Sequence, residues 1–342
     1  MTNVWLNRWF SVAYHYTNLI RNNEDGMKFT MYGTHPDPRH MSLQACDHAE
    51  VEPALPDADY VEFCLEFCQR NSIDVFIPRL KMLPIAAQVQ RFESIGTQVI
   101  VCQDVPLLKK LMDKHEFYES VLETGIMEMP DYYVVNTVEQ FQSAYAKLVE
   151  KGHKVCLKPT NSEGGMGFRV IDNNRDRLQD LFGAINRYVS YEEVVRLLSS
   201  VERFDDMMVM ELLEGYEYSI DSLANSNGEL LAAVPRRKAG GRLRLLDPVP
   251  ELLAIAQRVA ETYRIPYNFN IQVKYNHGVP KLLEINPRMS GGLHVSCLSG
   301  VNFPYLAVKS ALGMDVPVQT PHYNILASHI EQPMLMKEMT NP

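Results

Sequence analysis

Short apolar runs alternate with amphipathic segments in the N-terminal part of the chain. Residues 28–32, 74–78 and 97–102 have the apolar and β-branched composition of short strands. Residues 59–71 repeat apolar positions at helical spacing, and residues 84–96 predict a second helix that ends at a glycine. Strands that alternate with helices in this way predict a small parallel sheet covered by helices.

A different pattern begins at residue 104. One long helix is predicted over 104–122, with Asp104 as its N-cap, Pro106 in its first turn and Gly125 beyond its end. Further helices are predicted over 188–200 and 251–263, and strands over 134–135, 153–158, 168–171, 207–213, 216–223, 230–235, 269–275 and 279–285. This part is therefore predicted to be α+β, with a mostly antiparallel sheet.

Glycine is absent from the first strand-like segment, residues 4–10. A dinucleotide-binding lobe needs a glycine-rich turn directly after its first strand, because the backbone must approach the pyrophosphate closely. The N-terminal lobe is therefore predicted to have a Rossmann-like shape without an NAD site.

Composition narrows the class of protein. The chain has 342 residues, enough for two or three lobes, with 46% hydrophobic and 22% charged residues as in globular proteins. Its net charge of −9 argues against a nucleic-acid partner, since nucleic-acid binders usually present a basic face. The N-terminus does not read as a signal peptide and no apolar run is long enough for a membrane span, so no membrane partner is expected.

The six cysteines are dispersed and form no Cys-x-x-Cys pair. A secreted disulfide framework would show closer, paired spacings, so a reducing cytoplasm is the expected location. Cys64 and Cys68 lie four positions apart on a predicted helix. We expect buried thiols there rather than a metal site, because no second pair of ligands lies nearby.

Glycines follow a lysine in the first segment that could carry chemistry. Lys158 closes an apolar strand, and Gly164, Gly165 and Gly167 lie in the loop before the next strand. Glycines let backbone N–H groups approach an anion, and a neighbouring lysine adds positive charge. The segment is not a Walker A motif, because no Gly-Lys-Ser/Thr opens a helix, and by itself it could equally be a plain glycine turn.

Acidic residues flank a glycine break in the second segment, residues 209–221. Glu211 and Glu217 stand on either side of Gly215, between two predicted strands. Free backbone at such a break could hydrogen-bond an adenine edge, and a carboxylate could accept ribose hydroxyls. Considered alone, the segment is better explained as an exposed hairpin with solvated glutamates.

Oxygen-bearing side chains gather in the third segment. Glu284 and Asn286 are two apart on one strand and so point to the same face, and Gln272 lies on the neighbouring strand if residues 276–278 form the turn. Mg²⁺ takes oxygen ligands, and a glutamate inside an apolar strand is costly without a metal or a partner. Arg288 follows directly and could hold a phosphate oxygen. For this segment we therefore prefer a metal-binding function over a purely structural explanation.

Taken together and in this order, the three segments resemble the ATP-grasp superfamily over nearly the whole chain, and the oxygen-ligand set is most similar to its carbamoyl-phosphate-synthetase-like branch. The resemblance implies an α/β plus α+β fold, with a Rossmann-like pre-ATP-grasp domain over 1–105 and a two-lobed ATP-grasp domain over 106–335. Within the latter it implies a mobile lid subdomain over 131–208 and a C-terminal metal-binding subdomain over 209–335.

The resemblance also implies a role for particular residues. The ATP-binding set would comprise Lys114 and Lys158 at the phosphates, Gly164, Gly165 and Gly167 in the covering hairpin, Glu211, Leu212 and Leu213 at adenine, and Glu217 at the ribose. One or two Mg²⁺ ions, or Mn²⁺, would be bound by Gln272, Glu284 and Asn286. Arg288 would act with the two lysines on the transferred phosphoryl group.

The substrate site is expected at a basic segment of this acidic chain. Residues 235–244 predict a flexible loop around two glycines that grips an anionic substrate through Arg236, Arg237, Lys238 and Arg242, although a solvated charge run is the alternative. His294 could also reach substrate, but a core histidine is the preferred interpretation.

The activity that the resemblance implies is an ADP-forming ligase, which activates a carboxylate as an acyl phosphate for attack by an amine or similar nucleophile. A degenerate nucleotide-binding regulator is the alternative, opposed by the retained lysines, metal set and Arg288. A nucleic-acid binder is supported by the basic segment alone. Residues 190–203 enlarge the lid and could contribute to the substrate pocket or to a homodimer contact.

Overall fold

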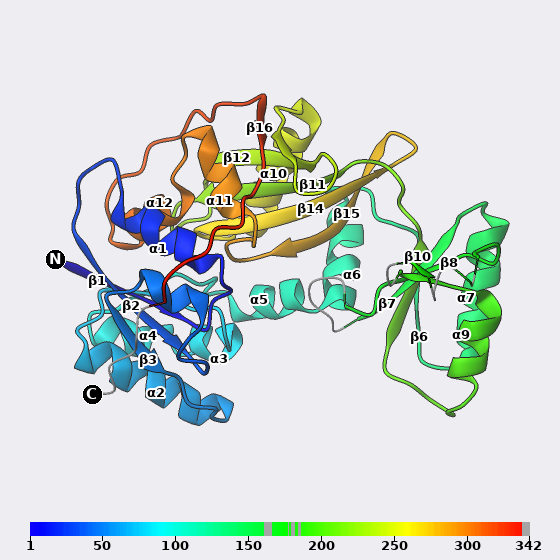
Figure 1. Ribbon diagram of the computed structural model, residues 1–342, viewed down its shortest axis with the longest axis horizontal. Coiled ribbons are helices and arrows are strands. Elements are labelled where there is room, and N and C mark those ends of the chain that lie inside the picture. Colours follow the sequence, from blue (N-terminus) through cyan, green and yellow to red (C-terminus); the bar gives the residue numbers. More distant parts are fainter. Residues whose placement is uncertain (161–165, 177, 179–181, 184–185, 337–342) are drawn as a thin grey trace. The chain divides into compact units, whose positions relative to one another are not determined.

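The computed structural model describes residues 1–160, 166–176, 178, 182–183 and 186–336, which form three β-sheets (Figure 1). The chain divides into two compact units. The large unit comprises Met1–Met112, Glu217–Val273 and Glu284–Pro342, and the small unit comprises Asp113–Tyr216 and Lys274–Leu283. The consecutive domain boundaries drawn from the sequence stay a prediction.

The first sheet of the large unit is parallel. Its strands are β1 (Thr2–Asn7), β2 (Phe29–His35), β3 (His48–Val51), β4 (Val75–Ile77) and β5 (Gln98–Val99), in the order β3-β2-β1-β4-β5. The helical elements of this part are α1 (Ala13–Arg21), η1 (Met41–Ala45), α2 (Asp57–Arg70), α3 (Met82–Ala86), α4 (Val89–Ser94) and α5 (Val105–Met112). The predicted parallel sheet with helices is confirmed, although the helix predicted over 84–96 is divided into α3 and α4.

The second sheet of the large unit contains antiparallel pairs, as predicted. It runs in the order β15-β14-β11-β12-β13-β16. Its strands are β11 (Glu217–Ala224), β12 (Leu230–Lys238), β13 (Arg244–Leu246), β14 (Asn268–Asn276), β15 (Val279–Asn286) and β16 (Ile325–Ala327). The helical elements beside it are α10 (Pro250–Tyr263), α11 (Leu293–Ser296), η2 (Cys297–Ser299) and α12 (Phe303–Ala311).

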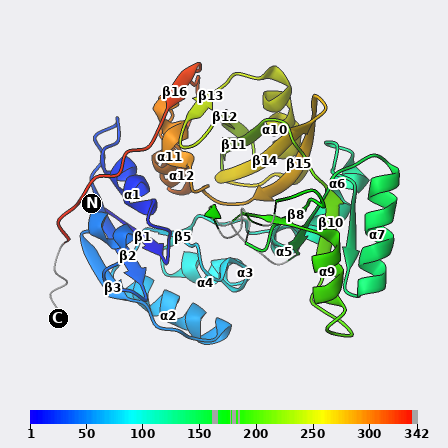
Figure 2. The same ribbon diagram turned by 45° about the vertical axis from the view of Figure 1, so that its right-hand side comes forward.

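One apolar core joins the two ends of the chain within the large unit. Val4 and Tyr16 belong to the same buried cluster as Val234, Phe303 and Tyr305. Helices α1 and α12 accordingly lie side by side in both views (Figures 1 and 2). The N-terminal lobe therefore buries apolar surface against residues near the C-terminus.

The small unit is built on a mixed sheet. Its strands are β6 (Tyr132–Val135), β7 (Val155–Pro159), β8 (Arg169–Ile171), β9 (Tyr188–Val189) and β10 (Met207–Glu211), in the order β6-β10-β7-β8-β9. Its described helices are α6 (Lys114–Thr124), α7 (Val138–Glu150) and α9 (Tyr191–Leu198). Aromatic contacts of Tyr191 with Phe141 and Tyr145 pack α9 against α7.

Two predicted helices have different boundaries in the structure. The single helix over 104–122 is wrong, because α5 ends at Met112 and α6 begins after Asp113, whose Oδ1 accepts from Glu116 N–H at 2.9 Å. Asp104 caps α5 as predicted, accepting from Leu107 N–H at 2.9 Å. The segment 188–200 starts as strand β9, and α9 then opens with a capping box that includes Ser190.

The six cysteines are free, and Cys64 and Cys68 are buried on α2 as predicted. Among the residues that the structure describes, no helix is long and apolar enough to cross a bilayer.

Candidate active site

The predicted metal ligands lie on strands β14 and β15, in the parts of these strands that belong to the large unit. His277 and Gly278 have φ of 49° and 83°, as a two-residue hairpin turn requires, so the predicted turn is confirmed. Gln272 is therefore on the strand next to Glu284 and Asn286. The carboxylate and amide oxygens of these side chains are the hard donors that Mg²⁺ takes, so the residues fit the predicted ion.

Hydrogen bonds connect these ligands to Arg288. Asn286 donates from Nδ2 to Glu284 Oε1 at 2.8 Å, and its Oδ1 accepts from Arg288 Nη2 at 3.2 Å. Arg288 also donates from Nη1 to the Met289 carbonyl at 3.1 Å. The structure thus brings the carboxylate, the amide and the guanidinium of the predicted Glu-x-Asn-Pro-Arg motif into one half-buried row.

A buried polar network holds the segment that follows Arg288. Asp221 accepts hydrogen bonds from Asn270 Nδ2 at 2.9 Å and from the hydroxyls of Ser290 and Ser296 at 2.6 Å each. Arg236 completes it, with Nε and Nη2 each 3.1 Å from Asp221 Oδ2. Because a buried carboxylate needs such partners, Asp221 organises this part of the site.

The structure corrects the expected substrate loop. Residues 235–238 belong to β12, and the turn is confined to 239–243, because strand pairing with β11 and β13 continues through Lys238. Arg236 is buried in the Asp221 network, and a Cβ at Gly292 would lie 2.5 Å from its guanidinium. A side chain at position 292 would therefore displace Arg236 from this network, and the predicted contact of Arg236 with substrate stays a prediction.

Three other basic residues of this segment face acids within the large unit. Arg237 Nε is 3.7 Å from Asp247 Oδ2, and Arg242 pairs with Glu331. Lys238 pairs with Glu217, the predicted ribose ligand. Their predicted contact with an anionic substrate stays a prediction.

His294 lies in a cluster of histidines. Its ring stacks on His15 at a centroid distance of 4.5 Å, and its Nε2 is 3.3 Å from Nδ1 of His329. Burial, helped by the neighbouring histidines and Arg236, lowers the pKa of His294 to about 4. The imidazole is therefore neutral at pH 7, and the preferred interpretation as a packed histidine agrees with this environment.

Both predicted phosphate-contacting lysines belong to the small unit. Lys158 Nζ lies 5.7 Å from the ring centroid of Tyr118 on α6. Lys114 is the first residue of that helix, four positions before Tyr118 and so on the same face. The structure thus places Lys158 against the helix face that begins with Lys114.

The segment predicted to form the covering hairpin lies only partly within the described residues. Gly167 has φ of 73°, and a Cβ there would lie 2.7 Å from Pro159 Cδ, so glycine is required at this position. Gly164 and Gly165 lie outside the described residues.

Backbone groups are available at the predicted adenine-binding hinge. Leu212 N–H donates to the Lys154 carbonyl at 2.7 Å, and Gly215 N–H donates to the Tyr275 carbonyl at 2.9 Å. Leu213 is buried between them, yet its N–H donates no hydrogen bond within the part of the chain that the structure describes. A buried N–H without an acceptor is rare, and a bound base edge would satisfy it.

The side chain of Glu211 is turned into a charged network that the sequence did not reveal. Its carboxylate is 0% exposed and pairs with Lys281, and its Oε2 lies 3.1 Å from His153 Nδ1. His153 Nε2 in turn faces Asp131 Oδ2 at 2.9 Å. These partners are distant in sequence and belong to no motif, so only the pairing of strands brings them together.

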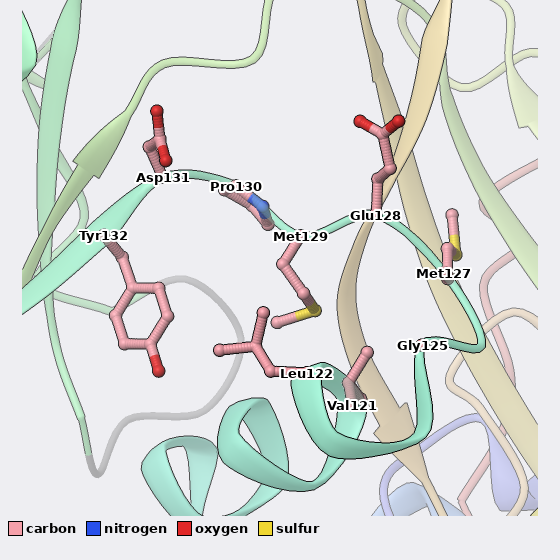
Figure 3. A pocket seen from close by; sticks show the side chains of 9 residues that line it. All are labelled: Val121, Leu122, Gly125, Met127, Glu128, Met129, Pro130, Asp131 and Tyr132. Atoms are coloured by element: carbon pink, nitrogen blue, oxygen red, sulfur yellow. The ribbon is translucent and has the colours of Figure 1, made fainter.

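A pocket of about 410 Å³ lies elsewhere in the small unit. Figure 3 shows the side chains of Val121, Leu122 and Met129 turned toward one another, whereas the carboxylates of Glu128 and Asp131 point to the other side of their segment. Its lining includes none of the residues predicted to bind ATP or metal.

Comparison with known proteins finds relatives over most of the chain. The family described as "ATP-grasp in the biosynthetic pathway with Ter operon" matches residues 203–333. The arginine-specific carbamoyl phosphate synthase large chain of Bacillus subtilis is 23% identical over 334 residues, covering 92% of this chain and 30% of that protein. The mitochondrial counterpart from Neurospora crassa is 26% identical over 251 residues, covering 67% and 20%. This chain therefore spans less than a third of either relative.

Solved structures share the fold at low sequence identity. An ADP complex of N5-carboxyaminoimidazole ribonucleotide synthetase gives a TM-score of 0.69 at 13% identity, covering 95% of this chain and 80% of that one. An L-amino acid ligase from Bacillus licheniformis gives a TM-score of 0.61 at 13% identity, covering 91% and 74%.

Proposed function

We propose that this chain is an ATP- and Mg²⁺-dependent ligase of the ATP-grasp superfamily, in its carbamoyl-phosphate-synthetase-like branch. It would activate a carboxylate as an acyl phosphate and join it to an amine or similar nucleophile, with release of ADP and phosphate. The family match, the carbamoyl phosphate synthase relatives and the shared fold support this proposal.

The observation that carries the proposal is the row of Glu284, Asn286 and Arg288. Hydrogen bonds link the carboxylate, the amide and the guanidinium in succession. Phosphoryl transfer needs positioned charges rather than covalent help from the protein, and this row offers both metal-binding oxygens and a cation for the transferred group. Bound Mg²⁺, or Mn²⁺ in its place, would neutralise charge on the phosphates.

The residues proposed to bind the nucleotide lie between β10 and β11, at the start of β11, on α6 and on β7. Leu213 N–H and the neighbouring Leu212 backbone would bind the adenine edge, since the Glu211 side chain is occupied by Lys281 and His153. Glu217 would exchange its partially exposed partner Lys238 for ribose hydroxyls. Lys114 and Lys158 would contact the phosphates.

The proposed reaction has two displacements. A substrate carboxylate oxygen attacks the γ-phosphorus, the bond to the bridging oxygen of ATP breaks, and ADP leaves. The amine nitrogen then attacks the acyl carbon, the bond to the phosphate oxygen breaks, and phosphate leaves as the nitrogen loses a proton. Arg288 and Lys158 would offset negative charge at the phosphoryl group.

The first test is ADP release with ATP and Mg²⁺ against pools of amino acids and small carboxylates. We expect release that depends on one acid and one nucleophile, and a decrease of about 100-fold or more in Glu284→Ala. Glu66→Ala, at an exposed position of α2, is the matched control and should retain full activity.

Two results would contradict the ligase. Equal ADP release by wild type and Glu284→Ala would remove Glu284 from the chemistry. Tight ATP binding without release in any pool would favour the regulatory nucleotide-binding protein instead.

A further inference from the structure

One face of the second sheet of the large unit carries residues that are proposed to bind nucleotide and metal. The strands of this sheet lie in the order β15-β14-β11-β12-β13-β16 (Figure 2). Asn270 donates to Asp221 from the neighbouring strand, so Asn270 and, two positions further on, Gln272 lie on the face of Asp221. Glu217 precedes Asp221 by four positions on β11 and lies on this face as well.

Strand pairing extends this face to β13. Lys238, at the end of β12, pairs with Glu217 of β11 on one side and is in register with Arg244, the first residue of β13, on the other. Residues directly opposite each other in paired strands point to the same side of the sheet. Arg244 is therefore the third residue of a row that begins at Glu217, the proposed ribose ligand. It was not among the residues that the sequence predicted to contact a ligand.

Arg244 differs from its basic neighbours in its partners. Each arginine and lysine over 236–242 faces a carboxylate. Arg244 instead donates from Nη1 to the carbonyls of Gly241 and Leu243, at 3.0 and 2.8 Å, and these bonds anchor one nitrogen to the turn. Its Nε and Nη2 donate no hydrogen bond to any residue that the structure describes. Because a guanidinium stays charged in proteins, this partly buried cation has no counter-ion among those residues.

The surroundings of Arg244 are positive. Burial lowers the pKa of its guanidinium, the charge of Arg236 lowers it further, and the attraction of Glu217 is the smallest of the three effects. Burial also lowers the pKa of His329, and the charge of Arg244 is the next largest cause. Lys238 places a like charge directly opposite Arg244, which is destabilising in a sheet. A bound anion would relieve this repulsion.

The unpaired edge of Arg244 has the geometry that oxygen anions need. Nε and Nη2 together form the fork that binds a carboxylate or a phosphate through two parallel hydrogen bonds. In the strand order, β13 lies three spacings from β14, the strand of Gln272, which corresponds to roughly 14 Å. An anionic group at Arg244 would therefore be several bonds away from atoms that react beside the metal ligands.

We infer that one of the two substrates to be joined carries an anionic group, a carboxylate or a phosphate, several bonds from its reacting atom, and that Arg244 binds this remote group. The inference rests on the proposed function for the place of the reacting atoms. It makes Arg244 a residue that selects substrates by a charge that takes no part in the chemistry.

Direct binding tests this without requiring turnover. Isothermal titration with Mg²⁺ and a non-hydrolysable ATP analogue compares adipate with hexanoate, as acids, and 6-aminohexanoate with hexylamine, as nucleophiles. The members of each pair differ only in the remote anionic group. In one pair, we expect wild type to bind the member with the remote anion about tenfold more tightly, since a hydrogen bond to a charged group is worth that factor or more. Titration with 6-phosphonohexanoate then compares phosphonate with carboxylate as the remote group.

Substitution then locates the preference. Arg244→Gln should weaken binding of the preferred probe about tenfold and leave binding of its uncharged-end counterpart unchanged, and Arg244→Lys should recover part of the loss. In the ADP-release assay, Arg244→Gln should raise the KM of the substrate with the remote anion about tenfold at nearly unchanged kcat, because the contact is made equally in the ground and transition states. Arg39→Gln, with a side chain that is 88% exposed in the same unit, is the matched control. Thermal unfolding of each variant separates lost binding from lost folding.

Failure of the inference and failure of the proposed function give different results. Equal affinities within both pairs in wild type, no binding of any probe, or an unchanged preference in Arg244→Gln would overturn the inference. ADP release with the same KM values in wild type and Arg244→Gln would also overturn it, yet support the ligase. A preference that is lost in Arg244→Gln, without ADP release in any pool, would support the anion site and contradict the ligase.

Discussion

At the residue scale, Glu211 illustrates how a charge is tolerated in the interior of the small unit. Its carboxylate is completely buried, with Lys281 at one oxygen and His153 at the other. Burial raises the pKa of the neighbouring Asp131, but hydrogen bonds from Lys151 and His153 outweigh burial and lower that pKa overall. Each of these two acids has a basic side chain placed beside it.

Loss of the Lys281 partner should therefore destabilise the protein. We expect Lys281→Met to lower the free energy of unfolding in urea by about 3–5 kcal/mol, because an unpaired carboxylate would remain buried. Lys154→Met removes the exposed pair with Glu214 and should cost less than about 1 kcal/mol. The double variant Lys281→Met/Glu211→Leu should regain most of the loss, and equal losses in the two single variants would refute the buried-pair account.

At the scale of elements, the glycine turns divide into those that need space and those that need only backbone freedom. Gly228, between β11 and β12, has φ of 76°, and a Cβ there would lie 2.4 Å from backbone atoms of Arg264. Gly278, between β14 and β15, has φ of 83° but nothing within 4 Å of a Cβ. The first turn is restricted by tertiary packing and the second only by local conformation.

Alanine substitutions should separate these two costs. Gly278→Ala should lower the free energy of unfolding by about 1–2 kcal/mol, the cost of a left-handed L-residue. Gly228→Ala should cost about 1–3 kcal/mol more, because the backbone of Arg264 must also move. Chemical denaturation of both variants measures the difference. Equal losses would contradict the prediction, because they would mean that the backbone of Arg264 moves at no cost in free energy.

At the scale of the whole molecule, residues from both ends of the chain meet in the large unit. His294 follows the metal strand, His15 lies on α1, and His329 follows β16. Burial lowers the pKa of all three, and that of His294 to about 4. The dependence of folding stability on acidic pH therefore arises from residues that only the folded large unit brings together.

The sign of the pH dependence follows from these shifts. The folded-state pKa of His294 lies below its ordinary value of 6.5, so the unfolded chain binds more protons between about pH 4 and 6.5. Stability should be complete above this window and fall as the pH drops through it. His294→Asn should reduce that fall by about 1–3 kcal/mol in urea unfolding at pH 7 and pH 4.5. His277→Asn, at a left-handed turn position that asparagine tolerates, is the control, and parallel curves for wild type and His294→Asn would contradict the assignment.

Much of the fold could be predicted because local sequence patterns specify most of its strands and helices. Apolar spacing indicated β1, β2, β4 and β5 of the parallel sheet and β11, β12, β14 and β15 of the second sheet, and the predicted cap at Asp104 is confirmed. The short strands β3, β13 and β16 were not predicted. The break at Asp113 was missed because the apolar spacing continues across it, and only a side-chain cap on Glu116 N–H distinguishes two helices from one.

The sequence by itself predicted a fold of the ATP-grasp type, which the solved structures share, and it predicted that Glu284 and Asn286 share one face of a strand with Arg288 just beyond its end, because the strand period is fixed. It could not determine which charges neutralise one another. Only the tertiary structure decided that Arg236 belongs to Asp221, that Glu211 faces Lys281 and His153, and that Arg79 and Arg288 share the Phe10 ring. These contacts join residues far apart in the chain, so no local periodicity encodes them, and they exist only once the strands have paired and the core has closed.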